Sequence, residues 1–163
     1  MDLNIYTDGS STKYFNRNIG GAAWIEVLNG VKIIHGSKAY MDATNNIAEL
    51  RAIDLGLYFL IKEINMKRVD PSQFTNINII TDSEYAIGVI TGEKTARANL
   101  DIINEIRTKY HTLLSKLPNL NIEFKHVRGH SGDQYNEECD KMAKNKIKEI
   151  KSTLKAKQNG ERS

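Results

Sequence analysis

The first quarter of the chain has the hydrophobic pattern of three strands. Short segments rich in β-branched and apolar residues occur at Leu3–Thr7, Ala22–Leu28 and Val31–Tyr40, as is typical of strands. Asn29 and Gly30 lie between the second and third segments, and this pair favours a two-residue hairpin turn. We therefore expect a three-stranded antiparallel meander at the start of the chain.

From Asn46 the apolar residues recur at intervals of three and four, which predicts an amphipathic helix. Thr44 and Asn45 precede this helix and are both suitable N-cap residues. A second long helix begins near Leu100 and ends before Pro118, because proline cannot continue a helix interior. The apolar face of the first helix consists of Ile47, Leu50, Ile53, Leu57, Leu60, Ile61 and Ile64.

Two further apolar segments, Ile77–Thr81 and Asn121–Val127, are predicted to be the fourth and fifth strands. Asp82 and Ser83 can cap a short helix that runs through Ile90. A loop over residues 128–135 precedes a last helix, whose apolar positions include Cys139, Met142, Ala143, Ile147, Ile150 and Leu154. Helical crossovers make strands four and five parallel. The expected fold is therefore α/β, a five-stranded mixed sheet flanked by helices.

The 163 residues are 40% hydrophobic and 26% charged, which is the balance of one globular domain. The single cysteine, Cys139, excludes an internal disulfide and a zinc site built on several thiolates. Leu57–Ile61 is the longest apolar run of the central helix, far below the roughly 18 residues of a membrane span. The first residues lack the pattern of a signal peptide. We expect a monomeric protein of the cytoplasm, with no membrane contact.

The net charge of +3 is unevenly distributed along the chain. From Lys141 to Ser163 there are eight basic and two acidic residues, so this part carries 8 − 2 = +6 and residues 1–140 carry 3 − 6 = −3. We place the main domain at residues 1–146 and a basic helix end and tail at residues 147–163. The basic part could bind a polyanion, or it could be a solvated helix face that frays.

Four acidic residues lie where folding alone would not place them. Asp8 and Asp82 follow apolar strands, Glu49 lies in the first turn of a helix, and Asp140 lies near the start of the last helix. Ligand sites gather at the carboxyl ends of parallel strands, where these residues would meet. Their mutual repulsion requires a cation, and oxygen ligands suit Mg²⁺ or Mn²⁺. A two-ion site of this kind predicts phosphodiester hydrolysis.

Each acid also has an ordinary structural interpretation. The segment after Asp8 could be a turn, Asp82 and Ser83 could only cap a helix, and Glu49 could be a favourable charge at a helix N-terminus. Short motifs match often by accident, so the combination carries more weight than any one of them.

Five segments that include these acids resemble type I ribonuclease H, in the order of that family and over about residues 3–143. They are Tyr6–Ser10, Thr44–Leu50, Thr81–Tyr85, Val127–Gly132 and Asn136–Ala143. The resemblance implies an endonuclease that hydrolyses the RNA strand of RNA/DNA hybrids with two Mg²⁺ ions, Mn²⁺ being a substitute. It also implies 5′-phosphate and 3′-hydroxyl ends, little sequence preference, and the four acids as both catalytic residues and metal ligands.

The same motifs imply roles for other residues. His130 is expected to assist proton transfer or product departure, which suits a side chain with an unperturbed pKa of about 6.5; an exposed loop histidine is the alternative. His35, His111 and His126 lie outside the motifs and are interpreted as structural. The expected substrate-binding residues are Gly9, Ser10, Thr44, Asn45, Asn46, Ser83, Lys94, Arg97 and Asn136.

Within this set, the resemblance assigns different parts of the hybrid to different residues. Gly9 and Ser10, with the helix glutamate, are expected to sense 2′-hydroxyls in the wide minor groove. Asn45 and Asn46 reach base edges there, with helix capping alone as the alternative. Thr44 matches a residue that holds a phosphate of the DNA strand.

The chain departs from the family pattern between the short helix and the second long helix. Several relatives have a basic protruding helix and an aromatic-rich segment there, which grip the DNA strand, whereas this chain has only a short segment from Thr91. Glu84 stands where better known relatives have an amide that contacts the minor groove. A carboxylate cannot donate in its place, so a contact of Glu84 with the substrate is in doubt. Two alternatives remain: another nuclease of the superfamily, such as a resolvase or an exonuclease, and a catalytically silent hybrid-binding module.

Overall fold

The computed structural model describes residues 1–128 and 133–161. Its five strands form one sheet in the order β3-β2-β1-β4-β5, which confirms the predicted mixed sheet. β1, β2 and β3 pair antiparallel, whereas β1, β4 and β5 run parallel. The strands are β1 (Asp2–Tyr14), β2 (Arg17–Leu28), β3 (Val31–Met41), β4 (Asn76–Thr81) and β5 (Asn121–His126).

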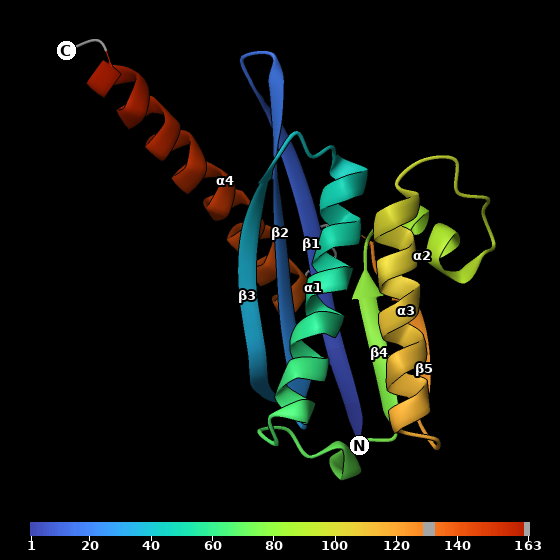
Figure 1. Cartoon of the computed structure of the whole chain (residues 1–163). Helices are drawn as coiled ribbons and strands as arrows, with labels where there is room; N and C mark the ends of the chain where they lie inside the picture. Colours follow the sequence, from blue (N-terminus) through green and yellow to red (C-terminus); the bar gives the residue numbers. More distant parts are fainter. Residues whose placement is uncertain (129–132, 162–163) are drawn as a thin grey trace.

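Helices cover both faces of this sheet (Figure 1). Helices α1 and α3 pack on one face, and α4 crosses the other, where Cys139 and Ala143 bury themselves against the β2 residues Ala23, Ile25 and Val27. None of the helices in the described part of the chain has the length and apolar character needed to cross a membrane. The helices are α1 (Asn45–Asn65), α2 (Glu84–Thr91), α3 (Leu100–Lys116) and α4 (Gln134–Glu161), with a short 3₁₀ turn at Pro71–Gln73.

The β1–β2 hairpin is longer than the sequence pattern predicts. Ser10–Tyr14 has no apolar alternation, but it pairs with β2 from Arg17 onward, and that long-range pairing satisfies its backbone hydrogen bonds. Asp8 therefore lies inside β1 rather than directly after a strand, which corrects the prediction. The predicted turn at Asn29 and Gly30 is confirmed, with φ values of 51° and 76°.

The helix starts also refine the predictions. The Thr44 hydroxyl accepts a hydrogen bond from the Ile47 N–H at 3.3 Å, so Thr44 is the N-cap of α1. Helix α4 begins before the predicted end of the loop, because Asp133 Oδ1 accepts the N–H groups of Tyr135 and Asn136.

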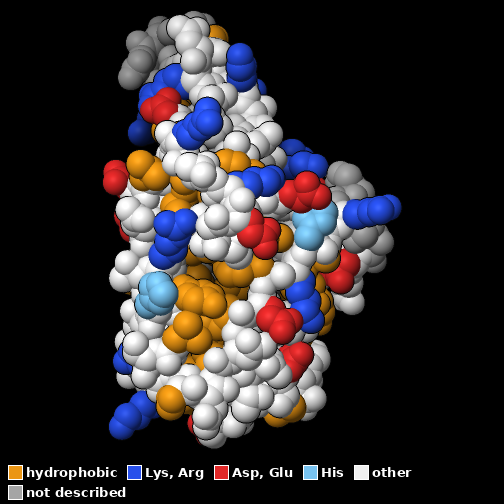
Figure 2. Space-filling view, turned by 90° about the vertical axis from the view of Figure 1, so that its right-hand side faces the viewer, with side chains coloured by type: hydrophobic (Ala, Val, Ile, Leu, Met, Phe, Trp, Pro, Cys, Tyr) orange, Lys and Arg blue, Asp and Glu red, His pale blue; other side chains and the backbone are white. Residues whose placement is uncertain are grey.

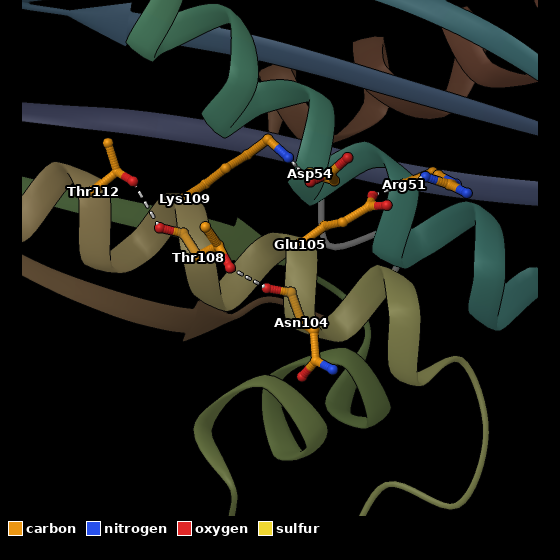
Figure 3. Close-up of polar contacts among 7 residues, drawn as sticks. All are labelled: Arg51, Asp54, Asn104, Glu105, Thr108, Lys109 and Thr112. Atoms are coloured by element: carbon orange, nitrogen blue, oxygen red, sulfur yellow. Dashed lines mark hydrogen bonds and ion pairs between the residues drawn. The ribbon is translucent and has the colours of Figure 1, made fainter.

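Polar contacts join α1 to α3 (Figure 3). Lys109 Nζ lies 2.7 Å from Asp54 Oδ1, and Arg51 Nη1 lies 3.4 Å from Glu105 Oε2. The Asp54 side chain is only 10% exposed, so this pair is the better shielded from solvent and salt. Together the contacts fix α1 against α3, and Glu49 lies in the second turn of α1 rather than in the first turn as predicted.

Candidate active site

Asp8 and Asp82 lie at matching places along two neighbouring segments, Asp8 within β1 and Asp82 one residue beyond the end of β4. The parallel pairing of β1 with β4 ends at Tyr6 and Ile80, and each aspartate lies two residues further along its chain. Because side chains alternate with a period of two along a strand, Asp8 faces the same side of the sheet as Tyr6, and Asp82 follows Ile80 at the same spacing. The sheet register therefore brings the two carboxylates side by side.

Glu49 joins them because α1 approaches β1 very closely at Gly9. A Cβ atom on Gly9 would collide with the backbone of Ala48 and Glu49, so only glycine allows this contact. Carboxylate oxygens of Asp8, Glu49 and Asp82 lie within 4.8 Å of one another. The structure thus brings together three of the four acids that the sequence singled out.

Burial and the neighbouring negative charges make the ionised forms of Asp8 and Glu49 unfavourable, and a bound cation would relieve this cost. Asp8 is 4% exposed and Glu49 is 9% exposed. Burial, with the charge of Asp82 adding to it, raises the pKa of Asp8, although the Gly9 N–H donates to Asp8 Oδ1 at 3.0 Å and opposes the shift. Burial and then the charges of Asp8 and Asp82 raise the pKa of Glu49 well above its ordinary value.

Glu49 Oε2 is buried and has no hydrogen-bond partner among the described residues. A buried carboxylate oxygen without a partner is unusual in proteins. Here it lies beside two further carboxylates, and a set of hard oxygen donors is what a divalent cation such as Mg²⁺ or Mn²⁺ binds. The residues present therefore fit a divalent metal site.

Asp140 lies beside this cluster rather than in it. Helix α4 packs so closely on β2 that a Cβ on Gly21 would collide with the Ala143 carbonyl. The charge of Asp140 contributes to the raised pKa of Asp8, which places it on the same side. Its Oδ2, however, lies 3.0 Å from Lys144 Nζ, and in residues 1–128 and 133–161 the converging oxygens come only from the other three acids.

The expected substrate-binding residues from the first half of the chain lie at the start of α1 and on β1. Because Thr44 caps α1, the side chains of Asn45 and Asn46 are not used as caps and stand exposed. Gly9 and Ser10 are half-buried on β1.

The remaining expected contacts are more scattered. The Ser83 hydroxyl caps α2, accepting from the Ala86 N–H at 3.0 Å. Lys94 and Arg97 lie in segment 92–99, which contains no helix. Asn136 is buried in the first turn of α4. His130 lies outside the described residues.

One residue near the cluster was interpreted as merely structural from the sequence. His126 Nε2 lies 3.1 Å from the backbone carbonyl oxygen of Asp82 and 3.9 Å from Glu84 Oε1. His126 ends β5 and pairs with Thr81, the last residue of β4. Its place at the end of a strand parallel to β4 was the available signal that it would lie against the Asp82 segment.

The carboxylate cluster does not coincide with the apolar hollow of the molecule. Figure 2 shows hydrophobic side chains gathered on one face of the molecule. A partly apolar hollow formed by α2, α3 and β5 has a volume of about 500 Å³ and is lined by Ile87, Ile90, Thr91, Glu93, Arg107, Tyr110, His111, Ile122 and Phe124. Convergent carboxylates, and not cavity size, identify the candidate active site.

Comparisons with known proteins agree on one family. A family model described as RNase H matches residues 1–148. A protein named Ribonuclease H from Caldicellulosiruptor saccharolyticus is 33% identical, over 92% of this chain and 99% of its own. Another from Clostridium botulinum is 32% identical, over 90% of this chain and 95% of its own.

Solved structures resemble the fold. RNase H1 from the archaeon Halobacterium salinarum has a TM-score of 0.62 at 21% identity, with 91% of this chain and 99% of that chain covered. LC11-RNase H1, isolated from compost and solved in complex with an RNA/DNA hybrid, has a TM-score of 0.67 at 19% identity, with 91% and 98% covered.

Proposed function

Because the chain belongs to the RNase H family and is a ribonuclease, we propose that it hydrolyses the RNA strand of RNA/DNA hybrids at the cluster of Asp8, Glu49 and Asp82. The observation that carries the proposal is the convergence of three carboxylates, with a buried oxygen of Glu49 left unpartnered among the described residues. A relative bound to an RNA/DNA hybrid has the same fold, which supports the choice of substrate.

We propose that Asp8, Glu49, Asp82 and Asp140 together hold two divalent ions, Mg²⁺ with Mn²⁺ as a substitute. Such a pair of ions, when bound, activates the attacking water and stabilises the leaving oxygen, giving 5′-phosphate and 3′-hydroxyl ends. The chain's own part is to hold four carboxylates: one within β1, one directly after β4, one on α1 and one on α4.

The residues around the cluster would select the hybrid. The exposed amides of Asn45 and Asn46 suit minor-groove acceptors that all base pairs share, so little sequence preference is expected. Gly9 and Ser10 lie beside Glu49, where a 2′-hydroxyl would be sensed. Thr44, Ser83, Lys94, Arg97 and Asn136 are proposed as further contacts, and His130 as the residue that assists proton transfer.

We also propose that the enzyme is a cytoplasmic monomer. All four proposed ligands come from one chain, and its one cysteine, Cys139, is buried as a thiol, which suits a reducing compartment.

The test is a cleavage assay with four substrates: RNA/DNA hybrid, duplex DNA, duplex RNA and a four-way junction. We expect cleavage of the RNA strand of the hybrid with Mg²⁺ or Mn²⁺, and none with a chelator. Preferred cleavage of the junction or of duplex DNA would show another nuclease of the superfamily. Hybrid binding without cleavage by either ion would show a silent binding module.

A further inference from the structure

Helix α4 carries a stripe of lysines that begins at the active site. Five of its lysines are spaced at intervals of three and four residues: Lys141, Lys144, Lys148, Lys151 and Lys155. At about 100° per residue, these five project within an arc of about 80°. Asp140 lies at the edge of the same arc, so the stripe extends along α4 from the proposed metal ligand.

The stripe faces away from the sheet. The buried face of α4 is formed by Cys139, Ala143 and Ile147, which point about 120° away from the centre of the stripe. Four of the five lysines are exposed, and Lys151 is half-buried. The stripe is therefore available to a partner while the helix stays packed on β2.

The far half of the helix is supported as well. Figure 1 shows the far half of α4 running out past the edge of the sheet. The Tyr14 hydroxyl donates to Gln158 Oε1 at 3.2 Å, and Leu154 lies with Phe15 and Met41 around one surface hollow. From Asp140 to Lys155 the axis spans about 22 Å at 1.5 Å per residue, so the hairpin fixes the direction of a long, continuous charged edge.

The charge of this edge is largely uncompensated. Between Lys141 and Gly160 there are seven lysines and one glutamate, a net of 7 − 1 = +6. Among the described residues, Lys144 is the one lysine of the stripe with an ion pair, to Asp140. Glu149 pairs instead with Lys146, which lies on the opposite flank of the helix.

We propose that this lysine stripe binds the sugar-phosphate backbone of the substrate duplex beyond the cleavage site. The proposal rests on the proposed function. It commits to a nucleic acid because the stripe starts at Asp140, beside the carboxylate cluster, so a duplex that is seated at the cluster and runs along α4 would meet a helix of opposite charge. Segment 92–99 offers only Lys94 and Arg97, so α4 would supply most of the phosphate contacts.

The experiment compares two double variants that each remove two positive charges from the same helix. Lys148→Gln/Lys155→Gln interrupts the stripe, whereas Lys146→Gln/Lys157→Gln removes two lysines from the opposite flank. For the stripe variant we expect KM for a long hybrid to rise about tenfold at moderate salt with kcat unchanged. We also expect the slope of log KM against log salt to fall by about two, since each phosphate that a lysine neutralises adds about 0.9 to it.

The flank variant should change KM less than about twofold and keep the wild-type slope, and both variants should keep the wild-type circular dichroism spectrum. Equal effects of the two variants, or none, would overturn the proposal. The proposal would also be overturned if the wild type bound phosphatidylserine vesicles through the stripe while the stripe variant kept the wild-type KM for the hybrid. If the wild type binds hybrid without cleaving it, the proposed function fails, and the stripe is then judged by the Kd of the same variants.

Discussion

Carboxylates are buried in two parts of this molecule, and their surroundings differ. Asp8 and Glu49 lie where strands β1 and β4 stop pairing, beside Asp82. Glu26 lies in the second half of β2, fully buried, and neither of its oxygens has a partner among the described residues. Burial, and then the charge of Glu63, raises the pKa of Glu26 well above its ordinary value.

The two places share burial and raised pKa values, so neither property identifies a metal site. The two places differ in the number of carboxylates whose oxygens lie close together. Three sets of carboxylate oxygens meet at the first place, so one cation can neutralise several charges there. Glu26 stands between the apolar strand neighbours Ile5 and Ile34, and only a proton can neutralise it.

The largest effect expected from this comparison is on cleavage. Asp8→Asn should lower kcat for RNA/DNA hybrid by about a thousandfold, because it removes a proposed ligand of the charge-stabilising ions. Glu26→Gln should leave kcat within about twofold of the wild type. Single-turnover cleavage of a labelled hybrid measures both. Near wild-type turnover of Asp8→Asn would show that the metal site is wrongly assigned.

The next effect is on stability with and without metal. Mg²⁺ at about 100 times its Kd should raise the free energy of unfolding of the wild type and of Glu26→Gln by about 2.7 kcal/mol. Asp8→Asn should lose most of this gain. Without metal it should be more stable than the wild type, because it relieves repulsion from Glu49 and Asp82. Thermal unfolding over a Mg²⁺ titration decides this, and an equal response of all three proteins would contradict it.

A smaller effect concerns pH. In the unfolded chain Glu26 ionises near its ordinary pKa, whereas the folded protein keeps it protonated to higher pH. The free energy of unfolding therefore falls between these two pKa values, by up to about 1.4 kcal/mol per pH unit. Glu26→Gln removes this loss, so it should stabilise the protein at pH 7 and have much less effect at pH 4, where the glutamate is protonated in both states.

Urea unfolding at pH 4, 5.5, 7 and 8 measures this gain. A gain that does not depend on pH would mean that replacing the carboxyl changes packing rather than proton uptake. The matched control is Glu123→Gln, an exposed carboxylate on β5, which should leave the dependence of stability on pH as it is in the wild type.

The smallest effect concerns His126, which contacts the carboxylate cluster only through backbone. His126→Phe removes the contact of Nε2 with the Asp82 carbonyl and should cost about 1 kcal/mol, as one hydrogen bond does. It should lower kcat severalfold and leave Mg²⁺ stabilisation nearly intact. Loss of metal binding as complete as in Asp8→Asn would mean that His126 has a larger part in the site.

The sequence predicts the cluster of Asp8, Glu49 and Asp82, but it does not predict the burial of Glu26. Crossover connections place β1, β4 and β5 in parallel, and this arrangement brings Asp8 and Asp82 together. Resemblance to a known family adds the substrate and the expected roles. Asp140 was expected in the cluster, but a lysine four residues later competes for it, a spacing at which helical charges meet.

Other features could not be predicted because they depend on tertiary contacts. The strand segment Ser10–Tyr14 is held by its partner strand and not by its own pattern. Glu26 fits the alternation of side chains along β2, so the sequence pattern does not single it out. The packing of α1 over that face of the sheet buries it. The close approach at Gly9 likewise depends on where α1 lies.

The pairing of β1 with β4 also has a consequence for the order of folding. The Thr7 hydroxyl donates to the backbone carbonyl oxygen of Ile80 at 3.5 Å, although the two residues are 73 positions apart in the chain. A slip of one residue in this pairing would turn Asp8 and Asp82 to opposite faces. A chain that has not closed this long loop in the correct register therefore has no cation site. Mg²⁺ cannot guide early folding steps, and should slow unfolding while leaving the folding rate nearly unchanged.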